Sequence, residues 1–183
     1  MRIAILSDIH DHVWNLDAAL AHLKPLADQL ICCGDLCSPF ILDQLARGFA
    51  GPIHIVFGNN DADLFRITAK TTQHPHVRLR GEFFEDDFDG RRIAVNHFDH
   101  IALAIARGER HDAVFYGHNH IHRAEHFGST LALNPGSIMG CQFDATARRT
   151  DVAATFALYE TTSRAVQSFA LSTDKQVKPL GTS

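Results

Sequence analysis

The chain has 183 residues, of which 45% are hydrophobic and 21% charged, and its formal net charge is −4. This length and composition are typical of one globular domain with a hydrophobic core. The weak negative charge gives no indication of a nucleic acid or a membrane surface as a partner, and no apolar stretch approaches the roughly 20 residues of a spanning helix. We expect one domain over residues 1–173 and a frayed polar tail over 174–183.

The cysteines and the first residues bear on the compartment. Four cysteines occur in a spacing that matches no disulfide framework or zinc motif: Cys32, Cys33, Cys37 and Cys141. The start, "MRIAILSDIH", is apolar only through Leu6 and does not have the pattern of a secretion signal. We therefore expect reduced thiols in a cytoplasmic protein.

The first half of the chain alternates between strand and helix patterns. Three short apolar runs, each stopping at a polar residue, predict strands at 2–8, 29–35 and 53–61. Apolar residues at helical spacing predict helices at 14–27 and 40–49. Pro25 should end or bend the first helix near Lys24, and Gly48 should end the second. Residues 61–73 are expected to be irregular to helical.

The second half is richer in hairpins. Three of them are expected around the turn residues Asp89-Gly90, Gly128-Ser129 and Thr161-Thr162-Ser163. Between them lie a helical pattern at 99–109 and a buried strand at 112–120. The order of elements predicts an α/β domain in which a partly parallel, helix-covered sheet packs near a second, mostly antiparallel sheet.

Polar side chains follow five of the apolar strands. They are Asp8 and His10; Asp35; Asn59, Asn60 and Asp61; His97; and His118 and His120. In open α/β sheets the ligand crevice lies at the carboxyl ends of the strands, so these five ends could converge on one place. Gly34, Gly58 and Gly117 precede three of them, and glycine permits the close backbone approach that a crowded site needs.

The donor atoms in this set point to metal ions. Seven side chains with nitrogen or oxygen donors, and no thiolate, are candidate ligands: Asp8, His10, Asp35, Asn59, His97, His118 and His120. Seven donors are too many for one tetrahedral zinc but suit two divalent ions about 3.5–4 Å apart with a bridging carboxylate. Mixed imidazole and oxygen ligands favour manganese, iron, cobalt, nickel or zinc over magnesium or calcium. Two such ions outweigh two carboxylates in charge and would attract a phosphate. Taken singly, each motif could also be a helix cap or a turn.

Together the motifs identify a family resemblance. The series D-x-H (8–10), G-D (34–35), G-N-x-D (58–61), a strand-end His (97) and G-H-x-H (117–120) closely resembles the calcineurin-like metallophosphoesterases. "NPGS" at 134–137 is similar to a segment of their small, single-domain phosphodiesterase branch. The resemblance implies a two-sheet αββα sandwich with a dinuclear centre, for which manganese is a common ion. It places Asp8, His10, Asp35 and His120 on the first ion and Asn59, His97 and His118 on the second, with Asp35 bridging.

This resemblance implies a metal-dependent phosphodiesterase acting on a small phosphodiester. A hydroxide bridging the two ions would attack phosphorus in line, with Asn59 and His118 in the catalytic group. Asp61 would contribute by orienting a neighbouring His or Asn. A phosphomonoesterase or a protein phosphatase is less favoured, because the short chain offers no large insertion to build a peptide groove.

The chain departs from the family pattern at two positions. Many members have a His, thought to protonate the leaving group, where Asn60 stands here, so we predict a preference for activated diesters such as aryl phosphates. Phe98 replaces a common Gly after the strand-end His, and His100 lies close by; we favour His97 as the ligand because it directly ends its strand. His12 and Asn60 are expected beside the substrate.

Three further residues near these motifs have two interpretations each. Trp14 belongs either to the entrance of the site or to the core, and Arg148 and Arg149 are better explained as exposed loop charges than as phosphate contacts.

One alternative comes from another functional class. The retromer subunit of this fold is similar to the small phosphodiesterases but acts chiefly by binding partner proteins, and its catalytic constellation is incomplete. The present chain has all seven candidate ligands, which favours chemistry over a metal-binding interaction module. The natural substrate, the native metal and the oligomeric state stay open.

Overall fold

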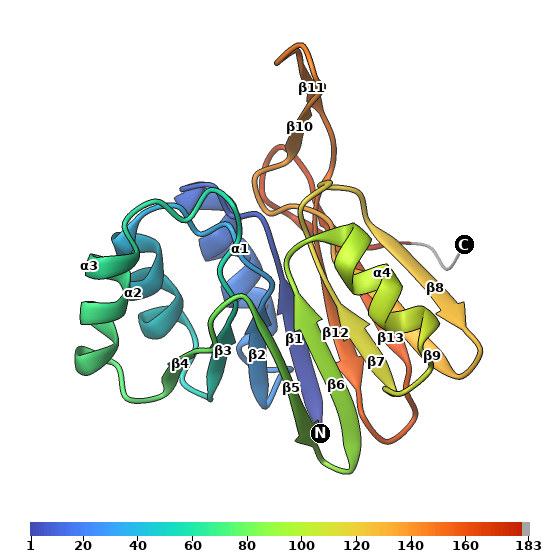
Figure 1. Ribbon diagram of the computed structural model, residues 1–183. Coiled ribbons are helices and arrows are strands. Elements are labelled where there is room, and N and C mark those ends of the chain that lie inside the picture. Colours follow the sequence, from blue (N-terminus) through green and yellow to red (C-terminus); the bar gives the residue numbers. More distant parts are fainter. Residues whose placement is uncertain (181–183) are drawn as a thin grey trace.

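The computed structural model describes residues 1–180 and consists of two facing sheets with helices on their outer sides (Figure 1). The first sheet has the strand order β14-β13-β12-β1-β2-β3-β4. Its strands are β1 (Arg2–Leu6), β2 (Gln29–Cys32), β3 (Ile53–Ile55), β4 (Val77–Leu79), β12 (Ala154–Glu160), β13 (Val166–Leu171) and β14 (Val177–Pro179). The strands β1 to β4 are parallel, and β12 to β14 extend the sheet in antiparallel pairs.

The second sheet has the order β5-β6-β7-β9-β8. Its strands are β5 (Phe83–Phe88), β6 (Arg91–Asn96), β7 (Ala113–Phe115), β8 (Arg123–Phe127) and β9 (Thr130–Asn134). The expectation of a mostly antiparallel second sheet is wrong, because β7 pairs in parallel with both β6 and β9. The helix α4 (Asp99–Arg107) connects β6 to β7 as a crossover, which makes these strands parallel. The third expected hairpin, β12-β13, joins the first sheet instead.

The alternation of side chains along the strands produces the layers. In β1, Ile3 and Ile5 pack between the two sheets, whereas Ala4 and Leu6 pack beneath the helices of the first sheet. These helices are α1 (Val13–Leu23), α2 (Pro39–Gly48) and α3 (Leu64–Lys70), followed by the 3₁₀ turn η1 (Thr71–Gln73). On the second sheet, Ala94 of β6 packs with the α4 residues Ala102 and Ala106. The αββα sandwich is thereby confirmed.

The C-terminal region holds two differences from the sequence-based expectation. A hairpin of β10 (Cys141–Phe143) and β11 (Arg149–Asp151) projects from the body of the sandwich and was not predicted (Figure 1). The expected frayed tail is wrong at 177–179, because β14 hydrogen bonds to β13; residues 181–183 of that tail lie outside the described part. No helix within residues 1–180 has the length and apolar character needed to cross a bilayer.

Candidate metal centre

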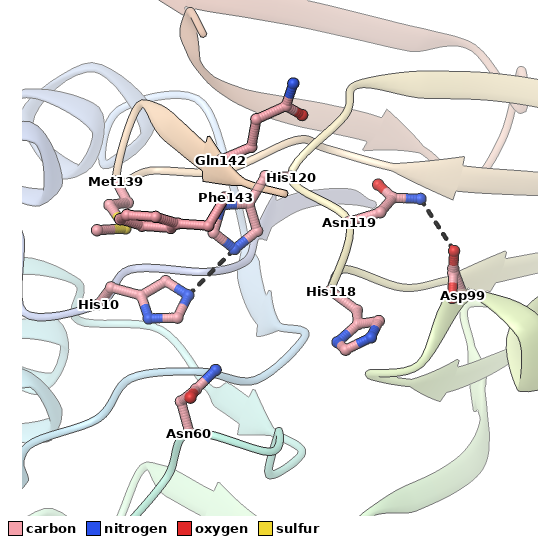
Figure 2. A pocket seen from close by; sticks show the side chains of 9 residues that line it. All are labelled: His10, Asn60, Asp99, His118, Asn119, His120, Met139, Gln142 and Phe143. Atoms are coloured by element: carbon pink, nitrogen blue, oxygen red, sulfur yellow. Dashed lines mark hydrogen bonds between the residues drawn. The ribbon is translucent and has the colours of Figure 1, made fainter. Parts of the chain in front are cut away.

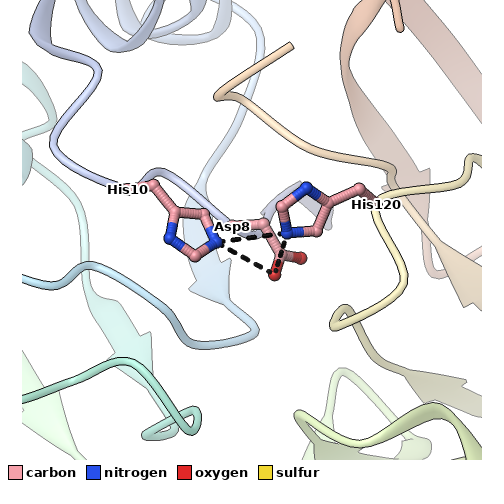
Figure 3. A group of neighbouring side chains, drawn as sticks. All are labelled: Asp8, His10 and His120. Atoms are coloured by element: carbon pink, nitrogen blue, oxygen red, sulfur yellow. Dashed lines mark hydrogen bonds and ion pairs between the residues drawn. The ribbon is translucent and has the colours of Figure 1, made fainter. Parts of the chain in front are cut away.

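All seven candidate ligands lie together beyond the carboxyl ends of β1, β2, β3, β6 and β7. One half of the cluster is formed by Asp8, His10 and His120 (Figure 3). Asp8 Oδ1 lies 3.2 Å from His120 Nε2 and 3.8 Å from His10 Nε2. The two imidazole Nε2 atoms are 3.1 Å apart. Nitrogen and oxygen donors from two distant segments of the sequence thus face one small space.

The other half of the cluster is formed around Asn59 and His97. Asn59 Oδ1 lies 3.1 Å from His97 Nε2 and 2.9 Å from His118 Nδ1. Asp35 lies between the halves, because its Oδ2 is 3.4 Å from both His10 Nε2 and His97 Nε2. Asp35 is therefore the carboxylate that faces imidazoles of both halves of the cluster.

The backbone at the cluster is strained. Five of the seven candidate ligands are non-glycine residues with positive φ: Asp8 (52°), His10 (44°), Asp35 (57°), His118 (74°) and His120 (62°). Left-handed conformations of this kind are uncommon outside glycine and cost of order 1–3 kcal/mol each. Strain concentrated on the donor residues indicates that the fold holds these side chains at a functional site.

Two of the glycines noted in the sequence leave the space that the carboxylates of Asp8 and Asp35 occupy. A Cβ atom on Gly58 would lie 2.2 Å from Asp35 Oδ1, and one on Gly117 would lie 2.5 Å from Asp8 Oδ2. Real Cβ atoms do not approach other atoms so closely. Any side chain at these positions would therefore displace a carboxylate of the cluster, as the close approach expected from the sequence implies.

Asp61 has a different contact set from the one expected. Its carboxylate accepts four backbone N–H groups, from Asp35 (3.0 Å), Leu36 (2.8 Å), Cys37 (2.9 Å) and Gly58 (2.7 Å). The prediction that it orients a neighbouring His or Asn side chain is wrong. Asp61 instead joins the loop after β2 to the loop after β3 and so fixes the position of Asp35.

Backbone carbonyls set the direction of two imidazoles. His97 Nδ1 contacts the carbonyl oxygen of Cys33 at 2.7 Å, and His120 Nδ1 contacts that of Cys141. A proton on Nδ1 leaves Nε2 unprotonated and directed at the cluster, which is the tautomer that a metal ligand needs. These carbonyl contacts are typical of the outer shell of a metal site.

The "NPGS" segment ties two of the loops together. Asn134 Nδ2 donates to the carbonyl oxygen of Gly117 at 2.9 Å, and Ser137 Oγ donates to that of Asp8 at 3.0 Å. The loop after β7 and the loop after β1 are thereby held by one segment. The backbone N–H of His118 completes this arrangement by donating to Asp8 Oδ2 at 3.1 Å.

The charges of the cluster fit cations. Asp8 and Asp35 are buried, and within residues 1–180 only imidazoles form ion pairs with them. Burial opposes their ionisation, but His10 and His120 hold the pKa of Asp8 well below its ordinary value, and His97 and Asn60 lower the pKa of Asp35. Two buried carboxylates without a lysine or arginine partner are the environment that divalent ions stabilise.

A cavity of about 600 Å³ opens over the cluster (Figure 2). Its lining residues come from loops that follow strands of both sheets, from the start of α4 and from the β10-β11 hairpin: His10, Asn60, Asp99, His118, Asn119, His120, Met139, Gln142 and Phe143. Asn60, expected beside the substrate, lies at this cavity, and both its backbone N–H and its Nδ2 donate to Asp35 at 2.8 Å. Asp99, Met139, Gln142 and Phe143 carried no motif signal in the sequence.

Other sequence candidates lie elsewhere. His12, expected beside the substrate, caps α1 by accepting the Asn15 N–H at 3.3 Å and lines a separate cavity. Trp14 is 70% exposed, which excludes a place in the core. His100 is exposed and contacts Asp99, so His97 is the residue that belongs to the cluster. Arg149 pairs with Asp151 on the β11 strand and lines the same cavity as His12.

Comparisons with known proteins indicate the family of this chain. A phosphodiesterase of Methanocaldococcus jannaschii, MJ0936, is 28% identical over 144 residues, which cover 76% of this chain and 86% of the relative. The structure of an archaeal phosphodiesterase superposes with a TM-score of 0.81 at 23% identity, covering 93% of this chain and 100% of the other.

Another solved structure, Vps29 of Entamoeba histolytica complexed with zinc, has a TM-score of 0.69 at 22% identity, covering 98% and 97% of the two chains. At these identities the two structural likenesses concern the fold. The model of the calcineurin-like phosphoesterase superfamily domain matches residues 1–164. The chain therefore belongs to the calcineurin-like phosphoesterase superfamily.

Proposed function

We propose that the protein is a phosphodiesterase that depends on two divalent metal ions, with manganese favoured. The observation that carries the proposal is the place of Asp35, whose Oδ2 lies 3.4 Å from an imidazole of each half of the cluster. The named activity of the archaeal relative supports a diester over a monoester as the substrate.

The residues of the cluster have distinct parts in this proposal. Asp8, His10 and His120 would hold one ion, Asn59, His97 and His118 the other, and Asp35 both. Two ions at this place would supply a water of lowered pKa and would offset charge on the phosphoryl oxygens. Asp61 and the Cys33 and Cys141 carbonyls keep these ligands in position through the contacts described above.

Asn60 limits the chemistry of the leaving group. An amide does not ionise at neutral pH, so this side chain cannot donate a proton as a general acid. Its two hydrogen bonds to Asp35 give it a positioning part instead. The proposed substrates are therefore small diesters with good leaving groups, of a size that a cavity of about 600 Å³ admits. The four free cysteines support a reducing compartment, and we propose the cytoplasm.

Hydrolysis of bis-p-nitrophenyl phosphate by manganese-loaded protein tests the proposal. We expect turnover that EDTA abolishes and added manganese restores, and a lower kcat/KM on p-nitrophenyl phosphate. Protein that binds two ions but hydrolyses neither ester would contradict the enzymatic proposal. That result would support the alternative of a metal-binding interaction module, for which the likeness to Vps29 is the structural observation.

A further inference from the structure

The β10-β11 hairpin places an aromatic ring at the mouth of the cavity. Phe143 is 52% exposed and lines the cavity together with His10, His118 and His120 (Figure 2). Eight large hydrophobic side chains of the described residues are substantially exposed, and Phe143 alone among them lines this cavity. Single exposed hydrophobic residues are ordinary on protein surfaces, but this one faces the candidate metal centre.

The two walls of the cavity differ in polarity. Imidazoles, carboxamides and a carboxylate form most of its lining, whereas Phe143 and Met139 provide its apolar part. Within residues 1–180, no other aromatic ring is paired with that of Phe143. An unpaired, half-exposed ring beside a polar cavity is available to a flat group of a ligand.

The base of the hairpin is anchored to the cluster, which keeps the backbone at Phe143 beside the cavity. The carbonyl oxygen of Cys141, two residues before Phe143, accepts the contact from His120 Nδ1, and the Cys141 side chain is buried. At this same open end of the hairpin, the backbone N–H of Val152 donates to the carbonyl oxygen of Gly140 at 3.1 Å. The position of Phe143 is therefore coupled to that of a candidate metal ligand.

We propose that Phe143, together with Met139, forms a stacking wall for a nucleobase on the substituent that stays attached to the phosphate after hydrolysis. This inference rests on the proposed function only in that the phosphoryl group of the same ligand occupies the imidazole side of the cavity. Stacking of one base on an aromatic side chain raises affinity by roughly 5- to 150-fold. Phe143 is in this account a specificity residue that acts on binding and leaves the bond-breaking step unchanged.

Two diesters with the same leaving group test the proposal. Thymidine 5′-(p-nitrophenyl) phosphate carries a base on the retained side, and methyl p-nitrophenyl phosphate carries none. For Phe143→Ala we expect KM on the thymidine ester to rise about tenfold, kcat to stay within about twofold, and both constants on the methyl ester to stay within about twofold. Phe143→Tyr should retain the KM of the unmodified protein.

Phe65→Ala is the matched control, because Phe65 is 84% exposed on α3 and lines no part of this cavity. Equal changes on both esters would overturn the proposal.

A binding measurement separates this inference from the proposed function. Isothermal titration calorimetry of manganese-loaded protein compares thymidine 5′-monophosphate with methyl phosphate. We expect the nucleotide to bind about tenfold more tightly, and Phe143→Ala to remove that difference. If no diester is hydrolysed but this difference is found, the proposed function fails and the stacking wall stands. Equal affinities for the two ligands, or no binding of either, would overturn the stacking wall.

Discussion

The floor and the rim of the cavity are built in different ways. The floor, defined as Asp8, Asp35 and His97, is buried and is hydrogen bonded to backbone from several strand ends. The rim, defined as Gln142 and Phe143, lies on a projecting hairpin, and its aromatic ring is half exposed. Positions on the floor are set by the core of the sandwich, whereas those on the rim are not. We infer that the fold fixes the positions of the candidate ligands, whereas substrate preference depends on one hairpin.

The largest expected effect comes from removing the charge at the centre of the floor. Asp35→Asn should lower kcat/KM on bis-p-nitrophenyl phosphate by at least about 10³-fold, because metal ions contribute several kcal/mol to such a reaction. Elemental analysis should show less than two ions per chain. Asp43→Asn is the control, since Asp43 pairs with Lys70 and His74 on the helices of the first sheet. Full activity of Asp35→Asn would contradict the claim that the buried floor is needed for hydrolysis.

Substitution of Asp61, whose contacts fix the position of Asp35, should have the next largest effect. Asp61→Asn removes the negative charge that accepts four backbone N–H groups. It also replaces one accepting oxygen by an NH₂ group, which cannot accept a hydrogen bond from these donors. We expect metal affinity to fall by about 10- to 100-fold, as for other outer partners of metal ligands. Titration with manganese, with circular dichroism as the check on folding, measures this effect. Unchanged affinity in a folded variant would show that Asp61 does not fix Asp35.

The sheet beneath the floor has its own pH dependence. His54 of β3 is buried between Phe84 and Phe88, its Nδ1 has no hydrogen-bond partner, and burial lowers its pKa to about 4. Below its ordinary pKa of 6.5 the unfolded chain binds this proton more readily, so stability falls as the pH drops. From pH 7 to pH 5 we expect the free energy of unfolding to fall by about 2 kcal/mol through His54.

Urea unfolding of metal-free protein at the two pH values checks this prediction. His54→Leu should reduce the difference between them by the same amount. If the difference in unfolding free energy between pH 7 and pH 5 is the same in this variant, His54 does not cause the loss of stability in acid.

The smallest expected effect on activity comes from substitution of Asn60, which lines the cavity between the floor and the rim. Asn60→His should raise kcat on an alkyl diester by about tenfold and on an aryl diester by less, because only the poorer leaving group needs a proton. The gain is at the low end for a general acid, since the variant also loses the Nδ2 hydrogen bond to Asp35. Equal effects on both esters would count against this interpretation of Asn60.

The sequence allowed the floor to be predicted because its residues end buried strands. Each of Asp8, Asp35, Asn59, His97 and His118 follows an apolar run, and strand ends on neighbouring strands meet at one edge of the fold. The αββα layers followed from the same runs and from the family resemblance. The choice of His97 over His100 rested on the same rule, and the structure places His97 in the cluster.

The contacts that support the floor could not be predicted in the same way. Asp61 binds backbone N–H groups, which every residue except proline carries, so nothing in the sequence marks its partners. The β10-β11 hairpin has three-residue strands, too short for a periodic pattern, and with it Phe143 was missed. His12 is two residues after His10 in the sequence, but as the N-cap of α1 it lines a separate cavity.

The central claim is that Asp35 contacts two metal ions at once. X-ray diffraction from manganese-soaked crystals, recorded for anomalous scattering, tests it directly. The account predicts two anomalous peaks about 3.5–4 Å apart, both within ligand distance of the Asp35 carboxylate. A single peak, or two peaks of which only one contacts Asp35, would contradict it.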